Sequence, residues 1–486
     1  MDQFYLRNVA QYEALVGAFV PPPAMTSGNL TKANAPGMVV SARIRPFLEE
    51  DKAAGFPSAV FPRAAPNGVI DIHDLYNHPR GRPILKSFNY SVDKVFTPEV
   101  STEQIFDDLL VGLIPFVQNG GVGTVFAYGQ TGSGKTFTIS RLQELAVEAL
   151  LPPFESQPTP SGSPSADVQL TIIELAGNSA FDLLSERKPI SILEDSHGTI
   201  HLSGASEHPI STPASALSLI EIAASFRRTA STLKNDASSR SHSICRIRVL
   251  NPSTNTQGFL YLVDLAGSEA ARDVATHGAE RMRETKEINM SLSVLKDCIR
   301  GRAEWDVQSQ AQSQSQSDSM IKGKKSGKPK PKPRIPFRQS ALTKVLKHVF
   351  DISEGSGSTE GGRETRTVVI ACVNPSLGDV AATKNTLRYA EMLRVAGLVS
   401  IAMGEKGGKE KEGPMGWGNR EVRRWIGENS GEPKISADIL APTETGAEML
   451  RMSMLEFEYR CMKSPGVTAG QAKALRSKFW KFHAES

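Results

Sequence analysis

The stretch GQTGSGKT at positions 129–136 has the residue types and the spacing of a phosphate-binding turn. Gly129, Gly134, Lys135 and Thr136 satisfy the pattern of Gly, four residues, Gly, Lys and Ser or Thr. Glycines let successive backbone N–H groups turn toward a polyphosphate, which side chains would obstruct. Lys135 would supply positive charge to the outer phosphates, and the Thr136 hydroxyl could bind Mg²⁺. The pattern therefore predicts a nucleotide site rather than a chance glycine-rich loop.

Two further stretches have the chemistry that a nucleotide site needs beside such a turn. NDASSRSH at 235–242 is rich in hydroxyls, and LVDLAGSE at 262–269 is an apolar run that ends in Asp264 and turns at Gly267. A carboxylate at the end of a buried strand can anchor a water ligand of Mg²⁺. Gly267 can bring its N–H within reach of a γ-phosphate. Each stretch alone could be an ordinary turn or strand end, but the three in this order indicate a nucleotide site.

The segments around these stretches predict the scaffold. Six apolar runs of strand type alternate with segments of helical spacing. The six runs are MVVSARI, GTVFAYG, VQLTIIEL, SICRIRVL, FLYLVDLAG and TVVIACVN. SRLQELAVEALL, directly after the glycine-rich turn, has the spacing of a helix. This alternation predicts an α/β fold, a three-layer domain with a central mixed β-sheet flanked by helices.

Length and composition limit the class of protein. The chain has 486 residues, which predicts two or three domains, and a net charge of +4, so a polyanion-binding surface would need local clustering. The four cysteines, Cys245, Cys298, Cys372 and Cys461, have no paired spacing, which favours reduced thiols over a disulfide or zinc framework. We expect no signal peptide and no membrane span, and hence an intracellular protein.

Composition shifts predict the domain boundaries. We expect a polar, proline-containing leader at 1–36, a main domain at 37–396, a linker at 397–414 and a small helical module at 415–486. Three low-complexity insertions interrupt the main domain, at 152–167, 303–334 and 353–364, and none can bury a core. Trp417, Trp425 and Trp480 suggest a small core in the last module.

Taken together, these motifs resemble those of the kinesin motor superfamily from about Val39 to Arg394. SARIRPF resembles the adenine-side motif, GQTGSGKT the phosphate loop, NDASSRSH and DLAGSE the two nucleotide-sensing switches, and EINMSL the microtubule-facing helix. IPFRQSALTKVL and NTLRYAEMLR resemble the two late helical motifs. The resemblance implies a microtubule-stimulated ATPase with ATP and Mg²⁺ as cofactors and the P-loop motor fold.

The resemblance also implies roles for single residues. Mg²⁺ would be bound by Thr136 and Ser239, with Asp264 acting through water. Asn235 and Ser238 would contact the γ-phosphate or the attacking water, with Gly267 beside them, and Arg240 and Glu269 would close as a salt bridge between the switches. The nucleotide would be bound by Arg43, Arg45, Pro46, Gln130, Thr131, Gly132, Ser133, Gly134, Lys135, Thr136 and Phe137. Phe137 stands where the family commonly has His, and an aromatic there could still stack on adenine.

The segment KEINMSLSVLKDCIRG predicts a helix with one apolar stripe, formed by Ile288, Leu292, Leu295 and Ile299, and with Gly301 as its C-cap. Its other face could be an ordinary solvated one, but after a nucleotide switch the resemblance implies a tubulin-binding helix. The basic tract at 322–334 follows this helix. Alone it could be a nuclear-import signal or a nucleic-acid tether, but beside this helix we favour an electrostatic tether to acidic tubulin. The residues expected at the microtubule are Lys296, Arg300, Lys322, Lys324, Lys325, Lys328, Lys330, Lys332, Arg334, Arg338 and Lys344.

Several stretches, LKDCIR among them, are most similar to the internal-motor, microtubule-depolymerising kinesins (kinesin thirteen). That group's Lys-Val-Asp loop tip is missing: Val92-Asp93 fits better in the strand that follows. A lysine-rich insertion is also typical of monomeric cargo-transporting kinesins, and no stepping neck with a coiled coil follows Arg394. We therefore expect a depolymerising or non-processive motor. The alternatives are a translocating, plus-end-directed kinesin and a tubulin-binding adaptor whose ATPase has decayed.

The last module, at 415–486, resembles a sterile-alpha-motif type of interaction domain, which would bind a protein partner; a generic helical cap on the motor is the alternative. The family implies a cytoplasmic location on the microtubule cytoskeleton, the spindle included.

Overall fold

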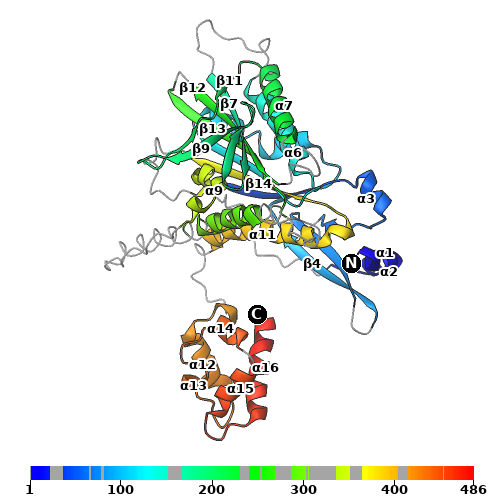
Figure 1. The fold of residues 1–486 in the computed structure, drawn as a ribbon. Helices are drawn as coiled ribbons and strands as arrows, with labels where there is room; N and C mark the ends of the chain where they lie inside the picture. Colours follow the sequence, from blue (N-terminus) through cyan, green and yellow to red (C-terminus); the bar gives the residue numbers. More distant parts are fainter. Residues whose placement is uncertain are drawn as a thin grey trace. The chain divides into compact units, whose positions relative to one another are not determined.

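The computed structural model describes residues 2–21, 37–64, 67–77, 81–151, 167–229, 240–251, 254–268, 286–302, 305, 335–350, 364–402, 414–452 and 454–485. The chain divides into two compact units, residues 1–404 and 405–486 (Figure 1). The first unit contains a large mixed sheet with helices on both faces, as the sequence predicts. No helix among the described residues is long and apolar enough to cross a membrane.

The large sheet has the strand order β10-β9-β8-β7-β12-β13-β6-β14-β1-β5, and β11 pairs with β7. The strands from β13 to β5 are parallel neighbours, whereas β12 pairs antiparallel with both β13 and β7. In chain order they are β1 (Met38–Ile44), β5 (Lys94–Phe96), β6 (Val122–Tyr128), β7 (Asp167–Ala176), β8 (Ser179–Asp182), β9 (Lys188–Glu194), β10 (Ile200–Ser203), β11 (His208–Pro209), β12 (His242–Asn251), β13 (Thr256–Asp264) and β14 (Thr365–Val373). All six strands expected from the sequence are present.

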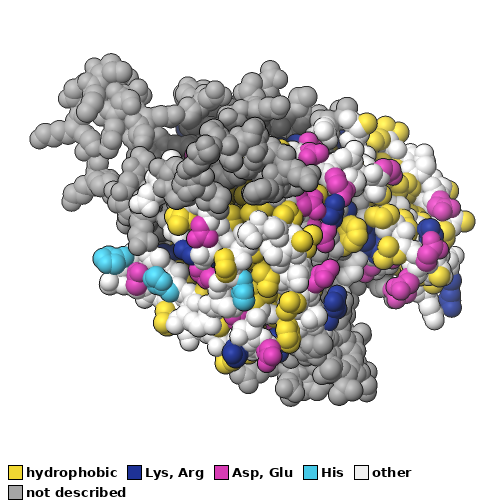
Figure 2. Space-filling view, turned by 90° about the horizontal axis from the view of Figure 1, so that it is seen from above, with side chains coloured by type: hydrophobic (Ala, Val, Ile, Leu, Met, Phe, Trp, Pro, Cys, Tyr) yellow, Lys and Arg dark blue, Asp and Glu magenta, His cyan; other side chains and the backbone are white. Residues whose placement is uncertain are grey.

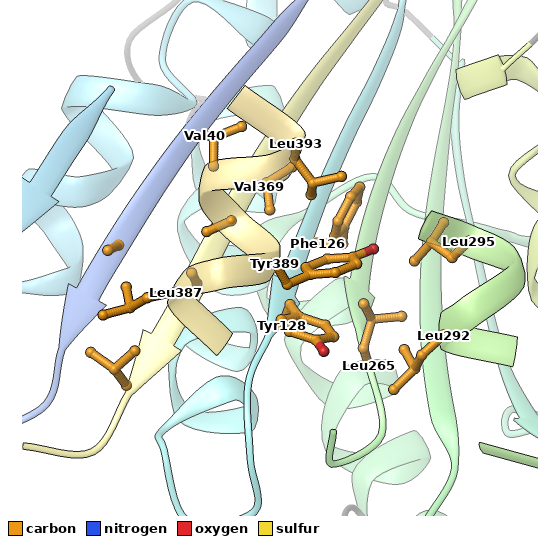
Figure 3. Packing of buried hydrophobic residues seen from close by; sticks show 14 of the residues in the cluster. Val40, Phe126, Tyr128, Leu265, Leu292, Leu295, Val369, Leu387, Tyr389 and Leu393 are labelled. Atoms are coloured by element: carbon orange, nitrogen blue, oxygen red, sulfur yellow. The ribbon is translucent and has the colours of Figure 1, made fainter. Parts of the chain in front are cut away.

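One face of the sheet is covered by α11 (Val380–Ala402), by the helix at 286–302, and by α9 (Ala341–Val345) and α10 (Lys347–Phe350). η4 (Phe337–Gln339) and η5 (Leu377–Asp379) are short turns near them. Figure 3 shows this core. Tyr128 of β6 stacks on Tyr389 of α11, with 4.1 Å between the ring centroids. Leu292 and Leu295 of the helix at 286–302 belong to the same core.

The opposite face carries α4 (Thr102–Leu109), α5 (Leu113–Gln118), α6 (Lys135–Leu150) and α7 (Pro213–Thr229). Side chains alternate between the two faces along β6, since Phe126 belongs to the first core while Val125 and Ala127 belong to the second. This two-sided burial explains why the central strands read as continuous apolar runs.

A second sheet of three strands, β2 (Val60–Pro62), β3 (Val69–Asn77) and β4 (Pro83–Ser91), follows α3 (Glu49–Ala54) in the chain. The sequence did not predict it. Val92-Asp93, expected in the strand after it, lies between β4 and β5, where the Asp93 carboxylate accepts from Val40 N at 2.8 Å and from Arg394 Nε at 3.0 Å.

The N-terminal segment differs from the expected polar leader. Residues 2–17 form α1 (Asp2–Arg7) and α2 (Val9–Gly17), and their Tyr5 and Tyr12 are buried in the first core. The Tyr5 hydroxyl donates to Asp74 at 3.0 Å, and the Tyr12 hydroxyl donates to the Ser58 carbonyl at 2.8 Å. Two tyrosines therefore join this segment to the domain, although the segment as a whole is polar.

The helix at 286–302 buries the predicted stripe of Ile288, Leu292, Leu295 and Ile299. The prediction of Gly301 as its C-cap is wrong, because the helix continues through 302. On the face shown in Figure 2, Lys and Arg side chains lie interspersed with Asp and Glu, which agrees with the small net charge.

The second unit contains η6 (Pro414–Gly416), α12 (Asn419–Asn429), α13 (Ala437–Leu440), α14 (Gly446–Arg451), α15 (Met454–Met462) and α16 (Ala469–Glu485). Trp425 and Phe479 are buried at its centre, with ring centroids 5.0 Å apart, and Trp417 and Trp480 pack against this core. The three tryptophans thus belong to one core cluster in the second unit.

Candidate nucleotide site

The glycine-rich turn connects β6 to α6, and α6 begins at Lys135. Gly134 has a φ of +92°, in the left-handed region that favours glycine. Gly129 lies so close to β14 that an added Cβ would stand 2.3 Å from the Cys372 carbonyl oxygen. Two of the motif glycines are therefore required by backbone geometry, one by its conformation and one by a close approach.

A cavity of about 350 Å³ opens beside this turn. Its lining brings together two parts of the sequence that are almost ninety positions apart, and it contains most of the residues expected to bind the nucleotide. These are Arg43, Arg45, Pro46, Leu48, Thr131, Gly132, Ser133, Gly134, Lys135, Thr136, Phe137 and Thr138.

Arg43, which is buried, and Phe137, which is exposed, lie side by side in the lining of this cavity. The Arg43 guanidinium lies 5.2 Å from the centroid of the Phe137 ring and donates to Thr138 Oγ1 at 2.7 Å. Phe137 is 68% exposed. A flat, exposed aromatic face next to a cation offers a stacking surface for a planar base.

Arg45 connects the turn to α3. Its Nε donates to the Gly132 carbonyl at 2.7 Å, and its guanidinium pairs with both oxygens of Asp51, at 2.5 and 3.0 Å. The guanidinium holds the pKa of the Asp51 carboxyl below its usual range. Arg45 thereby fixes the shape of the turn.

Lys135 and Gln130 lie at the inner end of the turn. Lys135 is 5% exposed, and its ammonium donates to the Gln130 carbonyl at 2.8 Å, as does the Ser133 hydroxyl at 2.7 Å. The side-chain oxygen of Gln130 is buried and has no hydrogen-bond partner among the described residues. The buried Lys135 ammonium at the floor of the turn is the charge that a phosphate group would neutralise, whereas the Gln130 side-chain oxygen is an acceptor and would need a donor.

The predicted Mg²⁺ anchors also converge. The Thr136 hydroxyl donates to Asp264 Oδ2 at 2.8 Å, which joins the first turn of α6 to the end of β13. Asp264 is 3% exposed, and its Oδ1 has no hydrogen-bond partner among the described residues. Because a buried, unsatisfied carboxylate oxygen is costly, Oδ1 is suited to receive a water ligand of Mg²⁺. Thr136 and Asp264 therefore fit the metal.

Arg227, near the end of α7, was not predicted as a site residue. Its Nη1 donates to Asp264 Oδ2 at 2.6 Å, and its Nη2 donates to the Ser241 carbonyl at 2.7 Å. The Ser241 hydroxyl in turn donates to Glu174 of β7 at 2.6 Å, and Glu174 also pairs with Arg187. The sequence signal for Arg227 was weak: an arginine pair in front of the hydroxyl-rich stretch.

Several expected site residues lie outside the described residues: Asn235, Ser238, Ser239 and Glu269, and the tract residues Lys322, Lys324, Lys325, Lys328, Lys330, Lys332 and Arg334. Arg240 precedes β12 by two residues. Gly267 is buried, and its neighbour Ser268 donates its N–H to the Gly129 carbonyl at 3.1 Å. The loop after β13 is therefore bonded to the first glycine of the phosphate turn.

The described residues expected at the microtubule lie on two elements. Arg300 is exposed and Lys296 half-buried on the helix at 286–302, and the Arg300 guanidinium contacts Met392 Sδ of α11 at 3.2 Å. Lys344 is half-buried in α9. Arg338 of η4 makes a two-point contact with Glu194 at 2.7 and 2.8 Å. Arg338 is thus engaged within the chain, which the sequence did not predict.

We compared the chain with known protein families, curated proteins and solved structures. The kinesin motor domain family matches residues 43–395. Diatom spindle kinesin-1 of Cylindrotheca fusiformis is 30% identical over 389 residues, and kinesin-like protein KIN-13B of Arabidopsis thaliana is 31% identical over 317 residues. These alignments cover 79% and 64% of this chain but only 54% and 40% of the relatives, so the chain spans about half of their length or less.

Relatives named KIN-5 and KIN-14 match at 30 and 31% identity, so the comparisons do not single out the internal-motor group. Among solved structures, the KIF14 dimer in its two-heads-bound state with AMP-PNP and a microtubule has a TM-score of 0.56 at 25% identity. That match covers 74% of this chain and 94% of the other. With the match over residues 43–395, the phosphate turn and the mixed sheet around it, this chain belongs to the kinesin motor domain family.

Proposed function

We propose that this chain is a microtubule-stimulated ATPase that couples hydrolysis of Mg·ATP to work on microtubules. The observation that carries the proposal is the meeting of Thr136, Asp264 and Arg227 directly behind the phosphate turn, where one Asp264 oxygen has no partner among the residues that the structure describes. Bound Mg²⁺ would neutralise charge on the phosphates.

The residues of the chain would act by positioning rather than by attack. The turn and Lys135 would bind the phosphates, and Arg43 and Phe137 would hold the base. Asn235 and Ser238 would orient the attacking water, and Arg240 and Glu269 would close the site. Such an arrangement lowers the barrier by orientation and by electrostatic stabilisation, so no protein nucleophile is needed.

The microtubule is the proposed partner because of the helix at 286–302. That helix buries one stripe in the motor core and turns Asp297 and Arg300 outward. The relative KIF14 was solved in complex with a microtubule, which supports the same partner here. Location on the microtubule cytoskeleton, the spindle included, follows from the same proposal.

Within the family we favour a non-processive or end-depolymerising motor over a translocating one. The LKDCIR stretch supports the depolymerising group. Against it, Val92-Asp93 does not occupy a hairpin tip, because it lies directly before β5. The module at 415–486, proposed to bind a protein partner, leaves both alternatives open.

Imaging of stabilised microtubules with the purified full chain and ATP separates these alternatives, with Glu269→Ala as the control. End-shortening that is lost in the control supports the depolymerase. Sliding of intact filaments supports a translocating motor, and salt-sensitive DNA binding without microtubule binding would contradict the proposed partner. A chain that binds microtubules without ATP turnover would be an adaptor.

A further inference from the structure

His242, the first residue of β12, is buried between the loop after β13 and the helix at 286–302. It is 2% exposed, and both of its ring nitrogens have partners. The backbone N–H of Ala266, in the loop after β13, lies 3.0 Å from Nδ1, and Ser291 Oγ, on the helix at 286–302, lies 2.8 Å from Nε2. One imidazole therefore bridges two elements that come from different ends of the site.

The partners settle which ring nitrogen carries the proton. A backbone N–H can only donate, so Nδ1 accepts from Ala266. The Ser291 hydroxyl donates to the Ile288 carbonyl at 2.7 Å, so its oxygen accepts from Nε2–H. Burial, together with the charges of Arg227 and Lys135, lowers the pKa of His242 to about 3, so the ring stays neutral with its proton on Nε2.

The chain on both sides of the His242–Ala266 contact leads to the nucleotide site. Ala266 is followed by Gly267 and by Ser268, whose N–H is bonded to Gly129 of the phosphate turn. The residue before His242 is Ser241, whose carbonyl accepts from Arg227, the partner of Asp264. Leu265 precedes Ala266 in the chain and Leu292 follows Ser291, and these two leucines lie close together in the apolar core (Figure 3). A polar bond inside an apolar contact fixes direction, which apolar packing alone does not.

We propose that His242 and Ser291 are positioning residues, and that their hydrogen bond is the joint through which the nucleotide-binding loops set the placement of the helix at 286–302. The proposal rests on the proposed function for the role of that helix at the microtubule, but the bond itself is tested without microtubules. The loss of one such bond changes an equilibrium by about two- to tenfold.

The test variant is Ser291→Ala in the full chain, because it removes the hydroxyl and leaves His242 in place. The matched control is Ser293→Ala, an exposed serine two positions along the same helix. His242→Asn is a second variant: its amide oxygen can still accept from Ala266 N, but it has no group at the position of Nε2. Thermal unfolding of each variant separates loss of folding from loss of coupling.

The readout is amide hydrogen exchange of residues 286–302 with ADP and with a non-hydrolysable ATP analogue. For each protein, the quantity compared is the ratio of the exchange rates in the two nucleotide states. We expect this ratio to be the same in wild type and Ser293→Ala, and about two- to tenfold smaller in Ser291→Ala. His242→Asn should do the same, and the double variant should add little, because both changes break one bond. An unchanged ratio in Ser291→Ala, or a wild-type helix that exchanges alike in both states, would overturn the proposal.

Microtubule affinity, measured for the same proteins in both nucleotide states, keeps the two proposals apart. If wild type does not bind microtubules, the proposed function fails, while the exchange ratio still decides on the joint. If wild type binds with a nucleotide-dependent affinity and Ser291→Ala retains the full dependence, the joint fails and the proposed function stands.

Discussion

Asp264 is the residue on which the site geometry depends most. One of its oxygens accepts from Thr136 and from Arg227, and the other is buried without a described partner. A carboxylate held this way is costly alone and is stabilised by its cation. The sequence could predict Asp264, because a charged residue that ends an apolar strand is conspicuous. It could not predict Arg227, which reaches Asp264 only through the packing of α7.

Arg227→Ala should lower the free energy of unfolding by about 3 to 5 kcal/mol, because it leaves the buried Asp264 carboxylate without its cation. Denaturant or thermal unfolding measures the loss. Arg228→Ala, an exposed neighbour on the same helix, is the control and should change stability much less. Equal losses in the two variants would show that the pair does not stabilise the fold.

His242 predicts a dependence of stability on pH. Its pKa is about 3 in the folded chain and close to 6.5 when unfolded, so the unfolded chain binds one more proton between these values. Stability is therefore full above pH 6.5 and falls as the pH drops toward 3. Between pH 7 and 5 the wild type should lose about 2 kcal/mol more than His242→Asn, measured by denaturant unfolding. Parallel pH profiles of the two proteins would exclude this role of the imidazole.

At the scale of elements, the sequence predicted the long central strands and missed short or exposed ones. It also missed β3, which is long and mostly buried but carries the polar residues Asp71, His73 and Asp74. β6, β13 and β14 are buried on both faces, so their apolar runs are unambiguous. β4 and β9 alternate between exposed and half-buried positions and carry polar residues, and β5 and β2 have three residues each. The helix at 286–302 was predicted from its stripe, but its end was not, because the helix continues past Gly301.

The N-terminal helices were also missed, since only two of their side chains are buried. Tyr5→Phe should lower stability by about 1 kcal/mol, because it removes the donor to Asp74, a carboxylate that also pairs with Lys384 of α11. Thermal unfolding checks this, with Tyr459→Phe, a 55% exposed tyrosine in the second unit, as the control. No difference between the two would mean that α1 does not stabilise the domain through this bond.

For the whole molecule, the decisive feature is the division into two units with separate cores. The tryptophans of the second unit suggested its core from the sequence, whereas no residue pattern in that unit indicates which partner it would bind. The family match, which covers 43–395, lies within the first unit.

A chain ending at residue 404 should therefore retain its nucleotide binding and its unfolding midpoint within the error of the measurement. Binding of a fluorescent ADP analogue and calorimetric unfolding of the full and shortened chains would show this. A large fall in either quantity would mean that the second unit completes the first.

The most direct test of the central claim is steady-state ATP turnover by the full chain with increasing microtubule concentration, with Lys135→Ala measured alongside. The account predicts slow turnover alone, a saturating rise of at least about tenfold with microtubules, and little turnover in Lys135→Ala because the phosphates lose their buried cation. Turnover that microtubules leave unchanged, or that survives in Lys135→Ala, would contradict it.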